Sequence, residues 1–262
     1  MRQNAVKRKL KNDEFVFGTM IKEMLTNPIV DLLELAGFDY FVLDMEHARY
    51  DMPIITGILQ YARKSAITGI VRIPELNYSN VAKALDMGAE GIWVPHIDTE
   101  QEAADLVQYA KYPPEGRRGA AVPPFRLKEL QAAEDHASYF KGCNDEVLLI
   151  AQIESRQAIG NVAKIAAVPG IDVCMMGTMD LSLDMGYPGK GGHPEMKKAI
   201  QKVVDACKEA NIASGTHIAG IDMIRYWMQQ GMRMITCSYE SNFIIDRGKE
   251  VLKLMKEGFV GE

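Results

Sequence analysis

Short runs of apolar residues recur along the chain and alternate with longer segments of mixed apolar and polar positions. Most runs are continuously apolar, as in strands that are buried on both faces of a parallel sheet. We therefore predict eight β-strands. They cover Phe15–Ile21, Tyr40–Leu43, Gly69–Ile73, Gly91–Pro95, Val147–Ile153, Ile171–Met176, Ile212–His217 and Met234–Ser238.

The segments between these runs carry apolar residues at helical spacing. The predicted helices cover Pro28–Ala36, Pro53–Ser65, Ser79–Met87, Thr99–Ala110, Ser155–Ala167, Glu195–Ala210, Gly220–Gln230 and Asn242–Lys256. Asn27 is expected to cap the first of them, with Pro28 in its first turn. Several helices are followed by a residue that favours a left-handed C-terminal cap, namely Gly37, Gly88, Asn211 and Gly231.

Eight alternating strand and helix units in 262 residues predict an α/β protein with a (β/α)8 TIM barrel as its single domain, over residues 1–262. A doubly wound open sheet is the competing architecture, but a long helix follows the eighth strand and no edge strand is indicated. Residues 111–146 interrupt the alternation with a loop rich in proline and glycine and then a polar helical stretch. Within it, Arg117 and Arg118 are equally compatible with closure over an anionic ligand and with a solvated turn or subunit contact.

Composition excludes several classes of function. The formal charge of −5 and pI near 5.6 give no basic surface for nucleic acid. No apolar run reaches the length of about 18 residues that a membrane helix needs. The basic segment 1–14 lacks the apolar core of a secretory signal and is expected to be a solvated helix or arm. Four widely spaced cysteines, without a CxxC pair, are expected to be reduced thiols in a cytoplasmic protein.

Titratable residues gather where the predicted strands end, which is where barrels of this kind bind ligands. The second strand runs directly into Asp44, Glu46 and His47. Asp44 and His47 form a candidate pair in which the carboxylate orients a histidine base. Arg72, flanked by Val71 and Ile73 on the next strand, is expected to bind a carboxylate of the protein or of a substrate.

Glu154 and Asp180 end the fifth and sixth strands and are the candidate metal ligands. Two neighbouring carboxylates need a cation between them or a raised pKa. Oxygen ligands of this kind suit Mg²⁺ or Mn²⁺. The alternative is that Glu154 caps the following helix and Asp180 opens a turn.

Other chemistries have weaker support. A Schiff-base aldolase needs a buried lysine on an inner strand. Lys22 is the only candidate, and the adjacent Glu23 would keep it charged. His96 and His217 are expected to be loop or core histidines. No glycine-rich phosphate loop or nucleophile elbow stands at a strand–helix junction.

In this context, many short motifs occur in an order that resembles the HpcH/HpaI aldolase family. They are Ala36-Gly37-Phe38-Asp39-Tyr40, Asp44-Met45-Glu46-His47, Val71-Arg72, Asp86-Met87-Gly88-Ala89, Val94-Pro95, Tyr112 to Gly119, Gln152-Ile153-Glu154-Ser155, Gly177 with Asp180-Leu181-Ser182, and Gly186-Tyr187-Pro188-Gly189. The resemblance covers nearly the whole chain. It implies a TIM barrel whose last helix swaps onto a neighbouring subunit, often in a hexamer built as a trimer of dimers.

The resemblance also implies roles for individual residues. Glu154 and Asp180 match the metal ligands, where Co²⁺ is a third candidate cation beside Mg²⁺ and Mn²⁺. The matches to catalytic residues are His47, Asp44, Arg72 and Asp86, the last as a further carboxylate linked to the histidine. Substrate binding is expected from Arg72 and Gln152 and from the backbone of Gly177, Thr178 and Met179.

Two departures from the family pattern concern the substrate. Thr178-Met179 replaces the usual Pro-Ala before the aspartate ligand, which places a bulky side chain beside the pocket floor. Lys22-Glu23 stands where small residues are common, near the expected position of the aldehyde.

The resulting prediction is a divalent-metal-dependent aldolase that cleaves a 4-hydroxy-2-oxo acid to pyruvate and an aldehyde through a pyruvate enolate. His47 would take the proton from the C4 hydroxyl, and Arg72 and the cation would stabilise the developing oxyanion. Two alternatives remain open. One is a lyase of citryl- or malyl-CoA type, and the other is a non-catalytic relative that binds a 2-oxo acid.

Overall fold

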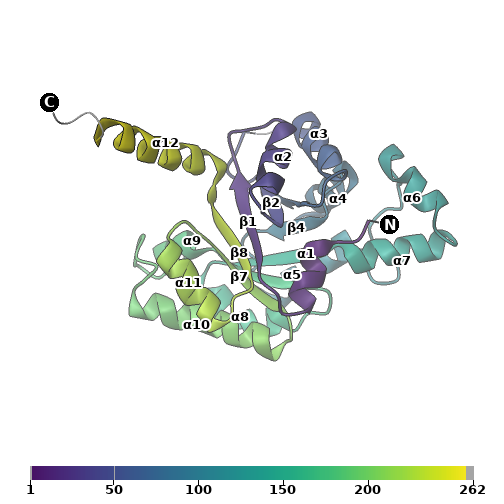
Figure 1. The fold of residues 1–262 in the computed structure, drawn as a ribbon. Helices are drawn as coiled ribbons and strands as arrows, with labels where there is room; N and C mark the ends of the chain where they lie inside the picture. The colour runs from purple at the N-terminus through teal and green to yellow at the C-terminus, as the bar shows by residue number, and fades with distance from the viewer. Residues whose placement is uncertain (1, 50, 258–262) are drawn as a thin grey trace.

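Eight parallel strands close into a barrel in the order β1 to β8 (Figure 1). The structure is a computed structural model and describes residues 2–49 and 51–257. The strands are β1 (Val16–Ile21), β2 (Tyr40–Asp44), β3 (Thr68–Arg72), β4 (Gly91–Val94), β5 (Leu148–Ile153), β6 (Val173–Met176), β7 (Ala213–Ile218) and β8 (Met234–Tyr239). Because β1 pairs with β8, the barrel is closed, which confirms the predicted TIM barrel and excludes the open sheet.

The helices follow the predicted alternation. They are α1 (Ala5–Lys11), α2 (Pro28–Leu35), α3 (Met52–Ala62), α4 (Tyr78–Met87), α5 (Glu100–Ala110), α6 (Leu127–Gln131), α7 (His136–Glu146), α8 (Arg156–Ala166), α9 (Thr178–Asp184), α10 (Pro194–Glu209), α11 (Ile221–Gln230) and α12 (Glu240–Glu257), with a 3₁₀ turn η1 (Pro124–Arg126). Each predicted strand and helix is confirmed with small shifts at its ends. The short helix α9 was not predicted, because it follows β6 directly without a capping side chain.

The helix ends distinguish good from poor sequence signals. All four predicted C-terminal cap residues have positive φ, including 117° at Gly88 and 56° at Asn211. The predicted cap by Asn27 is wrong. Its backbone is already helical, with φ −55° and ψ −40°, and its side chain makes no capping hydrogen bond.

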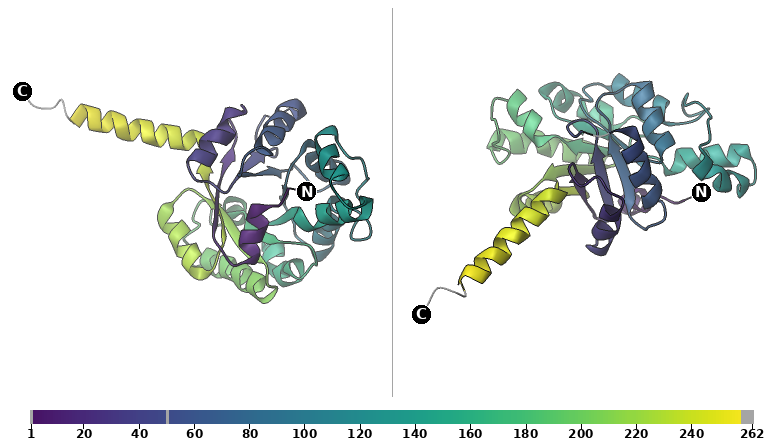
Figure 2. Two further views of the ribbon diagram at one scale, coloured as in Figure 1. Left: turned by 45° about the vertical axis from the view of Figure 1, so that its right-hand side comes forward. Right: turned by 90° about the horizontal axis from the view of Figure 1, so that it is seen from above.

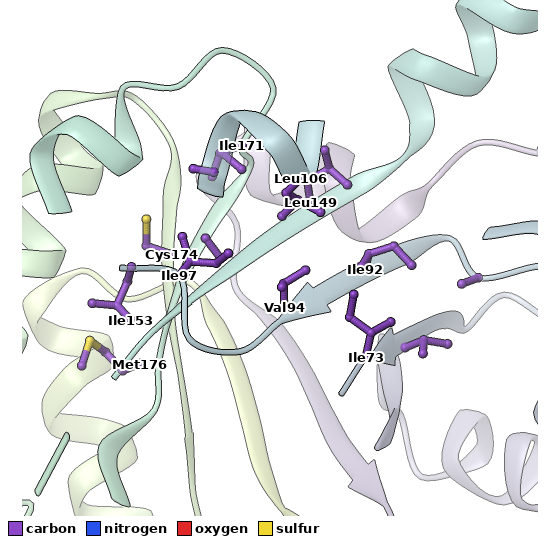
Figure 3. Close-up of a cluster of buried hydrophobic side chains, with 14 of the residues drawn as sticks. Ile73, Ile92, Val94, Ile97, Leu106, Leu149, Ile153, Ile171, Cys174 and Met176 are labelled. Atoms are coloured by element: carbon purple, nitrogen blue, oxygen red, sulfur yellow. The ribbon is translucent and has the colours of Figure 1, made fainter. Parts of the chain in front are cut away.

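Two separate apolar cores stabilise the barrel. Inside it, alternate strand residues such as Met20, Ile70 and Trp93 pack against one another. Between the barrel and the helices, outward-facing strand residues pack against the surrounding helices, as Leu149 of β5 does beside Leu106 of α5 in Figure 3. Because both faces of each strand are covered, the strands read as continuous apolar runs.

The sequence predicted a solvated helix or arm for the basic segment 1–14. The segment does form a helix, α1, but this helix is packed against the barrel. Val6 is fully buried and belongs to the core inside the barrel. Lys7 is also buried, and its Nζ lies 2.9 Å from Asp172 Oδ2. One face of α1 is therefore buried although the segment is basic, and the helix packs at the amino ends of the strands.

Residues 111–146 have the predicted form of a loop followed by helices. They contain η1, α6 and α7, and a small apolar cluster of Tyr112, Tyr139 and Cys143 stabilises them. Cys143, Cys174 and Cys207 are buried free thiols, and Cys237 is a half-buried one.

The last helix leaves the barrel. α12 projects away from the barrel beyond the end of β8 in every view, whereas helices such as α3, α8 and α10 lie against it (Figures 1 and 2). Among its described residues, Glu240 alone is buried. In the part of the chain that the structure describes, no helix is both long and apolar enough to span a membrane.

Candidate active site

The carboxyl ends of the strands enclose a cavity of about 580 Å³. His47, which follows β2, lies in its wall. Arg72 is the last residue of β3, Trp93 lies one residue before the end of β4, and Gln152 comes from β5. The backbone at Gly177 and the first turn of α9 close another side. The cavity is therefore where the fold predicts a ligand site.

Asp44 and Arg72 form a buried ion pair at the base of this site. They occupy directly paired positions of β2 and β3. Arg72 Nε and Nη2 each lie 2.8 Å from an Asp44 oxygen, and Nη1 lies 3.0 Å from Glu46 Oε2. Burial alone would raise the pKa of Asp44, but Arg72 outweighs it and holds that pKa below its ordinary value. Arg72 thus binds two carboxylates of the protein, and its fork is fixed in place.

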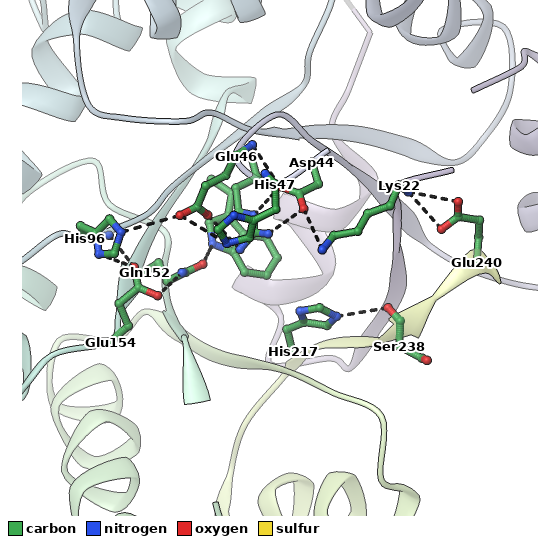
Figure 4. Close-up of polar contacts among 12 residues, drawn as sticks. Lys22, Asp44, Glu46, His47, His96, Gln152, Glu154, His217, Ser238 and Glu240 are labelled. Carbon is green, nitrogen blue, oxygen red and sulfur yellow. Dashed lines mark hydrogen bonds and ion pairs between the residues drawn. The ribbon is translucent and has the colours of Figure 1, made fainter. Parts of the chain in front are cut away.

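His47 does not form the predicted pair with Asp44. Asp44 Oδ1 accepts a hydrogen bond from the His47 backbone N–H at 3.3 Å, while the carboxylate is occupied by Arg72. The imidazole is 54% exposed, and its Nε2 lies 3.7 Å from Glu46 Oε1. Glu46, which was not among the predicted catalytic residues, is therefore the carboxylate beside the candidate base (Figure 4).

His96 belongs to the site and is not an isolated loop histidine. Its φ of +54° is a conformation that few residues other than glycine adopt. This conformation directs both its backbone N–H, at 2.8 Å, and its Nδ1, at 3.0 Å, to Glu154 Oε1. Gln152 Nε2 donates to the other oxygen of Glu154, and Trp93 Nε1 donates to Gln152. A chain of hydrogen bonds therefore fixes the Glu154 carboxylate.

Glu154 and Asp180 provide donors that fit a hard divalent cation. Glu154 is 3% exposed. Burial raises the pKa of its carboxyl, and repulsion by Asp180 acts in the same direction against the hydrogen bonds from His96 and Gln152. A Cβ at Gly177 would lie 2.3 Å from Glu154 Oε2, so the backbone approaches this carboxylate closely.

The alternative that Glu154 caps the following helix is wrong, because Ser155 caps α8. Asp180 lies in the first turn of α9 and faces the cavity. Among the described residues no group of three or more His, Cys, Asp or Glu side chains is arranged to ligate a metal. A cation here would take two protein carboxylates and leave its other positions to water and substrate, as Mg²⁺ does.

Comparisons with known proteins agree with this geometry. A family model described as HpcH/HpaI aldolase/citrate lyase matches residues 25–246. The chain belongs to this family. It is 36% identical over 192 residues, 73% of each chain, to a 5-keto-4-deoxy-D-glucarate aldolase from Shigella boydii. It is 28% identical to a hydroxypyruvate/pyruvate aldolase from Roseobacter denitrificans, over 97% of this chain and 98% of the relative.

Solved structures give the same result. The crystal structure of an HpcH/HpaI aldolase from Desulfitobacterium hafniense aligns with a TM-score of 0.89 and 30% identity over 96% of both chains. A citrate synthase, SbnG, aligns with a TM-score of 0.85 at 22% identity and shows a similarity of fold.

One residue implied by the family resemblance lies elsewhere. Asp86, at the C-terminal end of α4, forms an ion pair of 2.5 Å with Arg118. Arg118 lines a small cleft with Glu90 and Val147, which precede β4 and β5, so this pair lies at the amino end of the barrel. Within the described chain, Asp86 makes no recorded contact with His47. Arg118 therefore does not close over the cavity of its own subunit.

Residues from the two ends of this HpcH/HpaI-family chain meet at the site. Lys22 Nζ lies 3.5 Å from Asp44 Oδ2 and 4.4 Å from the Tyr239 ring centroid. Glu240, 3% exposed, accepts backbone hydrogen bonds from Lys22, Glu23 and Met24 at 2.6 to 3.1 Å. The carboxylate thereby fixes the loop that carries Lys22. Lys22 and Glu240 are 218 residues apart, so the sequence did not indicate this contact.

His217 is a neutral histidine in the cavity wall. Its Nε2–H donates to the Ser238 carbonyl at 3.2 Å, and its ring packs edge-on against Tyr239. Burial lowers its pKa to about 4, and the positive charges of Arg72 and Lys22 act in the same direction. It is therefore uncharged at neutral pH.

His217 should make the stability of the protein depend on pH. The unfolded histidine titrates near pH 6.5, so the unfolded state binds the extra proton first as pH falls from about 6.5 to 4. Between pH 7 and pH 5, we expect wild type to lose about 2 kcal/mol more free energy of unfolding than His217→Gln. Urea denaturation at both pH values measures this difference. Equal losses in the two proteins would contradict the assignment.

Proposed function

We propose that this protein is a divalent-metal-dependent aldolase that cleaves a 4-hydroxy-2-oxo acid to pyruvate and an aldehyde. The observation that carries the proposal is the buried Glu154 carboxylate, which lies close enough to Asp180 to be repelled by it. Glu154 also accepts a hydrogen bond from Gln152, which lines the cavity together with Asp180 and the fixed guanidinium of Arg72. Membership of the HpcH/HpaI family and the aldolase names of the relatives support it. The four free cysteines are consistent with a location in the cytoplasm, where thiols are kept reduced.

The 2-oxo acid would bind between the α9 N-terminus and Arg72. Gly177, Thr178 and Met179, where α9 begins, line the cavity, and the backbone N–H groups of Thr178 and Met179 would donate to the carboxylate. Arg72 keeps N–H groups beyond those used by Asp44 and Glu46, and these would donate to the ketone oxygen. When bound by Glu154 and Asp180, Mg²⁺, Mn²⁺ or Co²⁺ would supply Lewis-acid polarisation at this position.

Proton transfer would fall to His47. Its imidazole is half exposed, lines the cavity, and has its Nε2 3.7 Å from Glu46 Oε1. His47 would take the proton from the C4 hydroxyl as the C3–C4 bond breaks. Arg72 would stabilise the negative charge that develops on the pyruvate oxygen, and protonation at C3 releases pyruvate.

A condensation assay tests this proposal. The protein is mixed with pyruvate and a panel of aldehydes, with Mn²⁺ or with EDTA, and 4-hydroxy-2-oxo acids are measured by mass spectrometry. We expect product with Mn²⁺ and none with EDTA. Parallel reactions with acetyl-CoA and a 2-oxo acid test the CoA-lyase alternative. Turnover of the CoA thioester alone would replace our proposal with that activity.

We further infer that α12 packs on another copy of the chain, as expected from the family resemblance. Ile244, Leu252, Leu254 and Met255 are each more than half exposed on this projecting helix. On the barrel, Leu32 and Leu35 of α2 are likewise exposed apolar side chains. Burying two such apolar faces together would stabilise an oligomer.

Charge on the apolar face of α12 should therefore dissociate the oligomer. For Ile244→Glu/Leu252→Glu, we expect light scattering to give a smaller assembly than wild type, because each substitution places a charge in the interface. Lys253→Gln is the matched control, because the Lys253 side chain on the same helix is charged and 75% exposed. It should leave the assembly unchanged. A wild-type protein that is monomeric at micromolar concentration would contradict this inference.

A further inference from the structure

Part of the cavity lining is a set of apolar side chains from neighbouring elements, and we call the space they enclose the apolar chamber. Six side chains from β6, α9, α10, β7 and α11 form it, namely Met176, Met179, Ile200, Ile218, Met223 and Trp227. Met176, Ile200 and Trp227 are at most 1% exposed, so the inner walls are part of the packed core. The elements that carry them lie together in Figure 1, on the side of the barrel below α9.

The chamber is larger than pyruvate requires. The whole cavity holds about 580 Å³, and pockets of 300 to 1,000 Å³ typically enclose drug-sized ligands. Pyruvate has three carbons and would occupy the part between Arg72 and the first turn of α9. The apolar chamber therefore has space for the second product of the cleavage, the aldehyde.

Charge in the cavity is confined to the pyruvate side. Among the described residues that line it, Arg72 is the one lysine or arginine. Lys22 does not line the cavity, and its ammonium group lies against Asp44 and the Tyr239 ring. Asp180, the other charged residue besides Arg72 in the described lining, is negative and would repel an acid. A second carboxylate on the substrate would lose its hydration here without gaining a cation.

His217 does not alter this conclusion. It lines the cavity wall, but it is neutral at physiological pH because burial lowers its pKa to about 4. Its one ring N–H is used by the Ser238 carbonyl, so it can neither donate to a ligand nor act as the counter-charge of an acid.

We infer that the aldehyde half of the substrate carries an apolar chain or ring and no carboxylate, and that the apolar chamber binds it. This inference rests on the proposed aldolase function. In the synthetic direction, C3 of pyruvate loses a proton and attacks the aldehyde carbon, and the aldehyde oxygen takes up a proton as the hydroxyl of C4. The chain attached to that carbon then lies against Met223 and Trp227.

Selectivity among aldehydes tests the inference in the wild-type protein. With pyruvate and Mn²⁺, kcat/KM should rise about fourfold for each methylene from propanal through butanal to hexanal, the factor expected for burying one CH₂. Succinic semialdehyde, a four-carbon aldehyde with a carboxylate, should react at least about tenfold more slowly than butanal. A flat chain-length series, or a preference for succinic semialdehyde, would overturn the inference.

Variants identify the chamber as the cause. Met223→Lys adds a cation, and we expect the ratio of succinic semialdehyde to butanal to rise at least about tenfold. Met228→Lys changes the same residue type on the same helix, at a half-buried position outside the cavity lining. It should keep the wild-type ratio, and an equal shift in both variants would contradict a local effect.

A second variant covers the case in which Met223→Lys does not fold. Gly220 lines the cavity and a Cβ there would meet no atom within 4 Å, so Gly220→Leu can be accommodated and adds bulk at the cavity wall. It should reduce the advantage of hexanal over propanal, and an unchanged advantage would count against the chamber.

Exchange of the pyruvate methyl protons in D₂O, followed in the same wild-type preparation, separates this inference from the proposed function. Without exchange, the aldolase proposal fails and the chamber loses its basis. With exchange but no dependence on chain length, the chamber inference alone is wrong.

Discussion

Glu154→Gln is expected to lower kcat/KM for pyruvate-forming cleavage by a factor on the order of 10³. Glutamine keeps the shape of the side chain and can still accept the hydrogen bond from the His96 backbone N–H. It cannot supply the negative charge that a divalent cation needs beside Asp180. A coupled assay for released pyruvate, or the condensation assay in reverse, measures the loss.

A second readout does not depend on turnover. Mn²⁺ should raise the thermal midpoint of the wild-type protein, since a ligand that binds only the folded state stabilises it. This increase should disappear in Glu154→Gln. Glu195→Gln makes the same change at an exposed carboxylate on α10 and should behave as wild type. Full activity together with unchanged Mn²⁺ stabilisation in Glu154→Gln would contradict the assignment of this ligand.

Arg72→Ala is expected to abolish most activity and also to destabilise the protein by about 3 kcal/mol. The Asp44 side chain is completely buried and would lose the guanidinium that neutralises it, and Glu46 would lose its 3.0 Å partner. Because domains are typically stable by about 5–15 kcal/mol, the barrel should still fold. Urea denaturation and the cleavage assay measure the two losses separately.

A double variant separates the structural from the catalytic role of this arginine. In Arg72→Ala/Asp44→Asn the buried charge is gone, so most of the lost stability should return while activity remains absent. Recovery of activity together with stability would show that Arg72 acts only through Asp44. Native stability in Arg72→Ala itself would show that Lys22 is a sufficient partner for Asp44.

The parts of the site that the sequence predicted correctly are those that the barrel rule determines. Parallel strands bring their carboxyl ends to one rim, so Asp44, Arg72 and Glu154 could be placed together from the strand boundaries alone. The register of β2 and β3 sets Asp44 directly opposite Arg72. The positions of these residues along the chain were sufficient to place them, because each one ends a strand or directly follows one.

Contacts that depend on loop conformation or distant chain segments could not be predicted in this way. Asp44 and His47 are three residues apart, but in the turn after β2 the Asp44 carboxylate accepts hydrogen bonds from the His47 backbone N–H and from Arg72. It does not contact the imidazole. His96 reaches Glu154 only because of its positive φ, which its sequence context does not indicate. Glu240 meets the loop after β1 through closure of the barrel.

The position of Asp86 shows the limit of a resemblance. The motif Asp86-Met87-Gly88-Ala89 is recognisable, and Gly88 adopts the left-handed cap that ends α4. Because α4 runs opposite to the strands, its C-terminal end lies at the amino end of the barrel, where Arg118 binds Asp86. A role for Asp86 beside His47 would require another subunit to bring it there.

The most direct test of the account follows the methyl protons of pyruvate in D₂O by NMR, without any aldehyde. The wild-type protein with Mg²⁺ should exchange these protons for deuterium, and EDTA should stop the exchange. His47→Ala and Glu154→Gln should each reduce the rate by a factor on the order of 10² or more. Such a result would establish enolate formation at this site. An absence of exchange with Mg²⁺, Mn²⁺ and Co²⁺ would contradict the proposed aldolase function.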